Sequence, residues 1–200
     1  MNWAAIGTAT ESIGAISVAA AIPKFKQAIA YDSSFALAHA GLAYAWLLMP
    51  EYSASVGRGI TREKSEEAAA RSLELDPDLP EGLAVMAWNH LIGRYDWVEA
   101  ENLLRKALEV QANNSDALHW FSHVLSWQGL HEEAIKIAER AVESDPFSQL
   151  VKMNLSYILT DARQFERATL VRGEVSGFTP QNMLPTLELQ PDYPVIWHNM

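Results

Sequence analysis

Two histidines one helical turn apart are the first residues that could do chemistry. His119 and His123 stand four residues apart, so on a helix they share one face, as pairs of helical metal ligands do. A zinc site needs at least a third ligand and oriented groups behind the ligands, and the neighbouring Asp116 and Glu132 could be recruited only if the fold brings them close. The sequence between the histidines is WFS, so no HExxH motif is present. We therefore expect no metal site, and we interpret both histidines as part of a binding surface.

The rest of the sequence contains few residue patterns that could support catalysis. The acidic group Glu63, Glu66 and Glu67 has the spacing of a solvated helix face. The sequence contains no glycine-rich phosphate loop and no nucleophile elbow. The absence of cysteine removes disulfides, thiolate metal ligands and cysteine nucleophiles, and it suits a reducing compartment. We predict a protein that is not an enzyme and that has no catalytic residues and no cofactor.

Composition and charge narrow the class of partner. Hydrophobic residues make up 49% of the 200 residues and charged residues 20%, as in an ordinary soluble globular chain. The net charge of −10 would repel nucleic-acid phosphates. We expect a cytoplasmic protein whose partner is neither nucleic acid nor a membrane.

One apolar segment near the start of the chain needs a separate explanation. The run Ile13–Ile22 lacks the preceding Lys or Arg that a signal peptide would have. It is also shorter than the roughly 20 residues of a membrane span. We expect it to form a helix that is buried against its neighbours.

An internal repeat organises the chain. Three segments, at 26–39, 70–82 and 138–150, each join a helix tail to an Asp followed by Pro or Ser and then to a new apolar helix. Pro146 and Pro180 lie 34 residues apart, and Pro77 and Pro146 lie 69 apart, which is two periods of 34 plus one residue. We place the extra residue in the turn at 95–97. A 34-residue period with two helices per unit is typical of tetratricopeptide repeats.

The clearest unit runs from Asn113 to Pro146. Its first helix has an apolar face at helical spacing, and its second helix has a stripe of small residues that should be buried and lets the paired helices approach closely. Gly129 lies between them and can take the left-handed conformation that ends a helix. Pro146 cannot continue the second helix. The face comprises Leu118, Phe121, Ser122 and Leu125, and the stripe comprises Ala134, Ala138 and Ala141.

Alignment of the remaining sequence on this unit predicts the domain organisation. Residues 1–172 form an array of about four and a half units, and residues 173–200 form a degenerate or truncated C-terminal segment. We expect an unusually long connection through Pro50 to Thr61, and a capping box formed by Asp96 and Glu99. The segment 187–197 looks like another helix tail, turn and helix start, so we expect either a longer array or pairing there with a second copy.

These units resemble the tetratricopeptide repeat family over roughly residues 21–168. The resemblance implies an all-α fold, a right-handed superhelical solenoid of antiparallel helix pairs. The segments FKQAIAYDSSFALAHAGLAYAWLL, EEAAARSLELDPDLPEG and YDWVEAENLLRKALE are also similar to the repeat regions of bacterial regulators that carry adenylate-cyclase, winged-helix or kinase modules. In such proteins the repeats are the interaction or sensory half.

In this family the first helices of successive units line a concave groove, which implies a set of partner-binding side chains. Chaperone-binding relatives clamp a C-terminal carboxylate with Lys, Arg and Asn, and here only Asn154 fits that arrangement. We therefore expect a protein or peptide ligand with apolar or aromatic anchors. The predicted groove residues are Tyr44, Trp88, His119, His123, Trp127, Asn154 and Tyr157.

Two alternatives to this groove remain open. Any one of these side chains could instead complete the core. The module could also serve self-association, with exposed end helices pairing into a homodimer. For the groove itself we expect the two histidines to begin to charge near pH 6, and to repel each other when they do.

Overall fold

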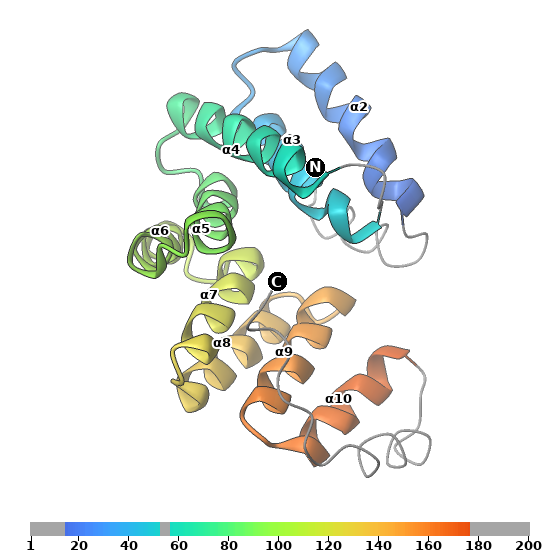
Figure 1. Cartoon of the computed structure of the whole chain (residues 1–200), viewed down its shortest axis with the longest axis vertical. Helices are drawn as coiled ribbons and strands as arrows, with labels where there is room; N and C mark the ends of the chain where they lie inside the picture. Colours follow the sequence, from blue (N-terminus) through green and yellow to red (C-terminus); the bar gives the residue numbers. More distant parts are fainter. Residues whose placement is uncertain (1–14, 53–56, 177–200) are drawn as a thin grey trace.

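The chain folds into helices that follow one another in hairpins. The computed structural model describes residues 15–52 and 57–176, and within those residues it contains nine helices and no strand. The predicted all-α solenoid of antiparallel helix pairs is confirmed (Figure 1). The expected helix start at 187–197, and most of the C-terminal segment 173–200, lie outside the described residues. The helices are α2 (Ala15–Tyr31), α3 (Ala36–Tyr52), α4 (Arg58–Leu75), α5 (Pro80–Arg94), α6 (Trp97–Val110), α7 (Ser115–Trp127), α8 (His131–Ser144), α9 (Gln149–Asp161) and α10 (Phe165–Ser176).

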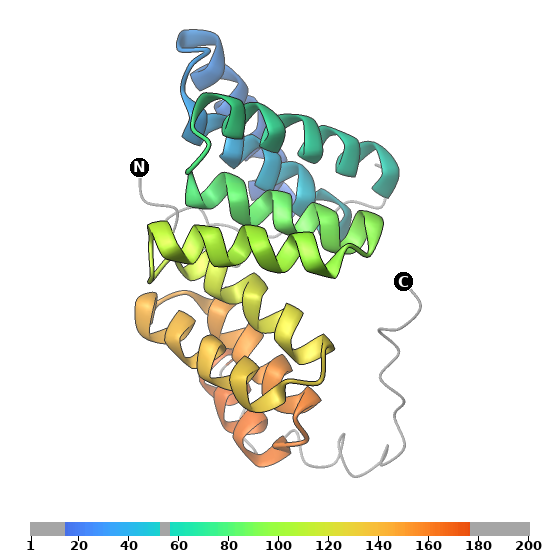
Figure 2. The same ribbon diagram turned by 90° about the vertical axis from the view of Figure 1, so that its left-hand side faces the viewer.

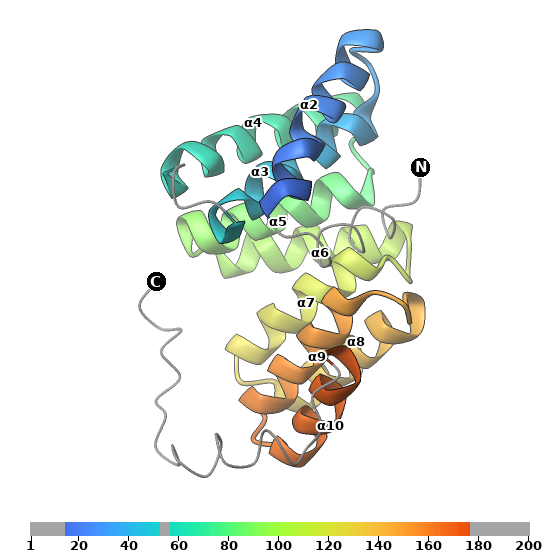
Figure 3. The ribbon, with the colours of Figure 1, turned by 90° about the vertical axis from the view of Figure 1, so that its right-hand side faces the viewer.

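The helices form two layers. Helices α3, α5, α7 and α9 contact one another in series, and we call them the inner helices. Each of α4, α6 and α8 packs between its own inner helix and the next one, and α10 packs on α9 (Figures 2 and 3). We call α4, α6, α8 and α10 the outer helices, and within the described residues no outer helix contacts another. The inner helices are therefore surrounded on more sides than the outer ones.

Local sequence explains where these helices begin. The Asp96 side chain accepts a hydrogen bond from the backbone N–H of Glu99 at 3.1 Å, so this part of the predicted capping box is confirmed. Asn114 accepts from the N–H of Ala117 at 2.9 Å in the same way. Each of these bonds satisfies a backbone donor that the first turn of a helix leaves free.

Three turns from an inner to an outer helix use the left-handed backbone conformation. Gly129 has φ of 81°, as its position in the repeat predicts. Tyr95 and Arg163, each 34 residues from Gly129, have φ of 54° and 59°. Because side chains with a Cβ rarely adopt this conformation, the repeated geometry of the turn outweighs the preference of these two residues.

The small-residue stripes form the seams of the array. Ala134, Ala138 and Ala141 have no exposed surface, so their predicted burial is confirmed. Ala100 and Ala107 occupy the same stripe on α6 and are also fully buried. An alanine stripe brings two helices close together, so a larger side chain there would force them apart.

Two expectations about the first units had different outcomes. The apolar run at 13–22 forms part of α2 from Ala15 onward, and its expected burial is confirmed at Val18 and Ile22, whereas Ala20 is exposed. The long connection from Pro50 to Thr61 is wrong, because α3 continues to Tyr52 and α4 begins at Arg58. A proline inside a helix removes one backbone donor and usually kinks or ends the helix, but α3 continues for two residues beyond Pro50. Of the described helices, none has the length and apolar character needed to cross a membrane.

Candidate groove site

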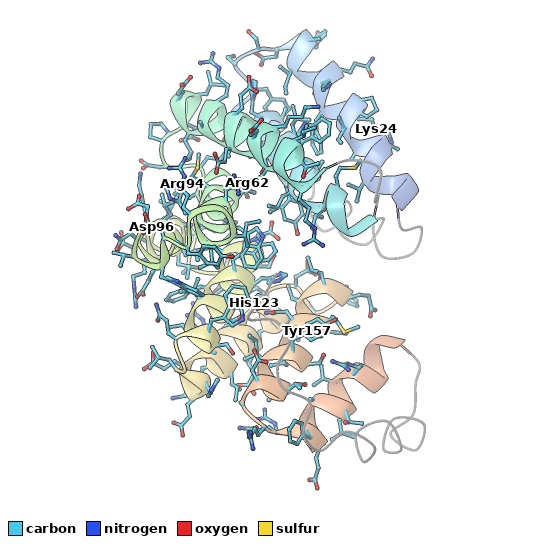
Figure 4. The ribbon with its side chains drawn as sticks, viewed as in Figure 1. Lys24, Arg62, Arg94, Asp96, His123 and Tyr157 are labelled. Atoms are coloured by element: carbon cyan, nitrogen blue, oxygen red, sulfur yellow. The ribbon has the colours of Figure 1, made fainter. Side chains whose placement is uncertain are left out.

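One position of the repeat carries a ring in every inner helix. The ninth residue of each inner helix is Tyr44, Trp88, His123 or Tyr157. Because inner helices follow one another in contact, equivalent positions form a row across the inner layer. Figure 4 shows His123 and Tyr157 on α7 and α9, two neighbouring members of this row. The four predicted groove residues at this position therefore lie in one row.

Rings from α5 and α7 gather around the middle of that row. The Trp88 and Trp120 rings stack with 4.1 Å between their centroids, and the His119 and Trp120 rings stack at the same separation. Trp127 lies 5.6 Å from Trp88 and 5.4 Å from His123. These separations are close to those of favourable aromatic pairs. We call Trp88, His119, Trp120, His123 and Trp127 the ring cluster.

Two aromatic residues of this region were not predicted from the sequence. Trp120 is a buried member of the ring cluster, and Trp97 packs edge-on against Trp127 at 5.7 Å. Trp120 lies four residues after Asp116 and seven before Trp127, and this spacing was a usable signal of a shared helix face. Trp97 is the first residue of α6, and only the packing of two helix pairs brings it to the cluster.

The predicted groove residues differ in how accessible they are. Trp127 and Tyr157 keep 40% and 46% of their surface exposed, while Trp88 and His123 are half-buried. Tyr44, His119 and Asn154 are buried.

Asn154 has a structural contact of its own. Its Nδ2 donates to Ser122 Oγ at 2.8 Å, which joins α9 to α7.

The two histidines are neutral at the pH of a cell interior. Burial lowers the pKa of His119 well below its usual value, and the nearby His123 lowers it further. Burial also lowers the pKa of His123, to about 4. The expectation that both begin to charge near pH 6 is therefore wrong, because removal from water penalises the imidazolium form.

Buried ring nitrogens in the cluster lack partners. Nδ1 of His119, Nδ1 of His123 and Nε1 of Trp120 are buried and have no hydrogen-bond partner among the described residues. A buried polar atom without a partner costs about 1–3 kcal/mol. Such atoms are unusual in a native core, and these three belong to neighbouring rings of one helix.

Carboxylates lie near both ends of α7. Burial raises the pKa of Asp116 to about 6, and the nearby Glu81 and Asp145 carboxylates raise it too. At the other end, burial raises the pKa of Asp161, although the Ser126 hydroxyl donates to it at 3.0 Å and opposes the shift. Within the described residues no set of three or more His, Asp or Glu side chains is placed to hold a metal ion.

Comparison with known proteins agrees with this architecture. Residues 91–156 match the tetratricopeptide repeat family. The matched segment runs from the end of α5 into α9. The array resembles TTC0263, a thermophilic TPR protein of Thermus thermophilus, at 14% identity and a TM-score of 0.65, over 94% of this chain and 89% of that one. It also resembles PilF of Pseudomonas aeruginosa at 16% identity and a TM-score of 0.58, over 94% and 82% of the two chains.

The sequence comparison adds no individual relative, since no curated protein matches this chain. Tetratricopeptide repeat proteins generally mediate protein–protein interactions, and solenoids of this kind offer extended concave surfaces for them.

Proposed function

We propose that this array is a protein-interaction module that binds a peptide segment of a partner along its inner helices. The observation that carries the proposal is the row of rings at the ninth position of every inner helix. Two aromatic side chains beside or within this row, Trp127 and Tyr157, remain 40% and 46% exposed, and Ile92 of α5 remains 41% exposed. Exposed aromatic residues held by a rigid scaffold are typical anchors of interfaces.

The packing around the exposed rings supports their role as anchors. Trp127 is held between Trp88 and Trp97, at 5.6 Å and 5.7 Å. A ring fixed in this way loses little conformational entropy when a ligand covers it. Truncation of such an anchor typically costs about 2 kcal/mol or more of binding free energy.

The test uses a library of synthetic peptides and the intrinsic tryptophan fluorescence of the whole chain. We expect peptides with aromatic or aliphatic side chains to bind, and Trp127→Ala and Tyr157→Ala to weaken them by about 30-fold each. Phe147→Ala is the matched control, because Phe147 is 82% exposed but lies in the turn between α8 and α9. If Phe147→Ala weakens binding as much as the groove variants do, the inner helices are not the site.

Self-association through the end helices is a second candidate function. The last described helix, α10, carries Phe165 and Leu170 with 46% and 57% of their surface exposed. Light scattering over a dilution series separates the two functions. A dimer that persists on dilution, and that Leu170→Glu dissociates, would favour self-association.

The resemblance to repeat regions of bacterial regulators suggests the setting in which such a module would work. In that setting the array would be the interaction half of a cytoplasmic regulator, and an output domain would be supplied elsewhere. The neighbouring reading frame would test this directly.

A further inference from the structure

We infer that the segment bound in the groove is basic as well as apolar, with a Lys or Arg side chain seated at Asp116 about three residues from an apolar anchor on the ring cluster. This inference rests on the proposed function, since it names the chemistry of the ligand at the same site.

The first observation is a group of carboxylates that converge without a cation. Asp116 and Glu81 are each the second residue of their inner helix, α7 and α5, so they are equivalent positions on neighbouring helices. Asp145 reaches the same place from the end of α8 and acts on Asp116 electrostatically. Asn114 Nδ2 approaches Glu81 Oε1 at 3.4 Å. Within the described residues, no Lys or Arg forms an ion pair with any of the three carboxylates.

Five other carboxylates of the described residues have a Lys or Arg partner. Glu139 pairs with Arg167 at 2.6 Å, and Asp78 pairs with Lys106 at 2.8 Å. The missing cation matters at Asp116 because like charges in a partly buried site repel each other more strongly than they would in water. The raised pKa of Asp116 reflects its burial and that repulsion. A ligand cation would offset both.

The second observation is independent of charge. His119 and Trp120 are almost fully buried, since their exposed fractions are 3% and 6%, and each has a ring nitrogen without a partner among the described residues. They follow Asp116 by three and four residues, which places all three on one helix face. Trp120 Nε1 is only a donor, so the group that would satisfy it is an acceptor such as a peptide carbonyl. A bound peptide with a Lys or Arg side chain would carry such a backbone carbonyl close to its cation.

The spacing of the site gives the spacing of the ligand. Asp116 and His123 are seven residues apart on α7, which is about 10 Å along the helix axis. An extended peptide covers about 10 Å in three residues. A second copy of this chain is a poor occupant, because two chains of net charge −10 repel each other.

The experiment measures the affinity of the whole chain for nine-residue peptides that contain one central Phe. In one set a Lys is moved through the other positions, in a second set a Glu replaces it, and in a third set an uncharged norleucine replaces it. We expect peptides with Lys about three residues from Phe to bind about tenfold more tightly than their norleucine versions, and Glu versions to bind more weakly still.

Substitution at the carboxylate provides the decisive comparison. Asp116→Asn should remove the preference for Lys while it leaves the affinity for the norleucine peptide within about twofold. Glu133→Gln, which removes one negative charge from the exposed surface of α8, is the matched control and should leave the preference intact. Circular dichroism confirms that each variant folds.

The possible failures are distinguishable. If Phe-containing peptides bind equally well with Lys, norleucine or Glu, the inference about a basic ligand is overturned and the proposed function stands. If none of the peptides binds, both are overturned. If Glu133→Gln reduces the Lys preference as much as Asp116→Asn does, the effect comes from overall charge and the inference is wrong.

Discussion

The inner helix α7 and the outer helix α8 belong to the same repeat but use different side chains to hold it together. Helix α7 buries large side chains, including Leu118, Trp120 and Phe121, whereas the buried face of α8 consists of alanines and Ile135. The difference follows from their surroundings: α7 contacts α5, α6, α8 and α9, and among the described helices α8 contacts only α7 and α9. The comparison teaches that the inner helices supply both the bulk of the core and the candidate binding surface.

The largest expected effect comes from the buried member of the ring cluster. Trp120→Ala should lower the free energy of unfolding by about 3–5 kcal/mol, because it leaves a cavity between α5 and α7. Trp127→Ala on the same helix should cost less than about 1 kcal/mol, since 40% of that side chain is exposed. Urea unfolding midpoints at constant m-value measure both. Equal costs would mean that Trp127 is a core residue rather than an anchor.

A change in the alanine seam tests the other half of the comparison. Ala138→Leu should lower the free energy of unfolding by about 1–3 kcal/mol, because the added volume separates α8 from its neighbours. Lys136→Leu adds a leucine two residues away at an exposed position of α8 and should change stability by less than about 0.5 kcal/mol. An unchanged melting temperature for Ala138→Leu would show that the assigned repeat register is wrong.

The histidines of the ring cluster make the stability of the inner helices depend on pH. The folded pKa of His123 is about 4, below the value of about 6.5 in an unfolded chain, so the unfolded state binds more protons between those values. Stability is therefore lost as the pH falls from 6.5 towards 4, and His123 should account for about 1 kcal/mol of the loss between pH 7.5 and 5.5. His123→Gln should remove that share, as chemical unfolding at both pH values would show.

The partly buried Asp116 changes stability with pH in the opposite direction. The pKa of Asp116 is raised in the folded state, so its ionisation destabilises the fold as the pH rises towards 6. That contribution is present in both the parent chain and His123→Gln, and it cancels in their difference. A pH dependence unchanged by His123→Gln would mean that this imidazole is solvated.

The smallest expected effect is at the start of an outer helix. Asp96→Ala should cost about 1 kcal/mol, because it leaves the N–H of Glu99 without its side-chain acceptor. Glu109→Ala removes a carboxylate at an exposed position of the same helix, and as the control it should stay within about 0.5 kcal/mol. A loss of equal size in both variants would point to the surface charge of α6 rather than to the cap.

The sequence was most informative where the fold depends on nearby residues. The alanine stripe, the Asp96 cap and the left-handed turn at Gly129 each follow from the identity and spacing of residues within one or two helices. The outer helices are therefore predicted well, because their pattern of one small buried stripe and charged remaining faces is local.

The ring cluster was predicted only in part, because it depends on how helix pairs stack. Trp97 reaches Trp127 from a neighbouring repeat, and no spacing along one helix reveals that contact. The low histidine pKa values were missed for the same reason, since burial comes from neighbouring helices rather than from position 119 or 123 alone. The expectation that His119 and His123 begin to charge near pH 6 used the pKa of an imidazole that is exposed to water.

Contacts between helices in the described residues never reach beyond the second neighbour along the chain. Such an array behaves as a line of coupled units rather than as a single cooperative globule. A disturbance at α10 must pass through α9 and then α7 before it reaches the rings of α5. Amide hydrogen exchange would then be graded along the molecule, fastest at the ends and slowest near α7. A ligand that contacts several inner helices would link repeats that otherwise open one after another, and it would slow exchange in all of them.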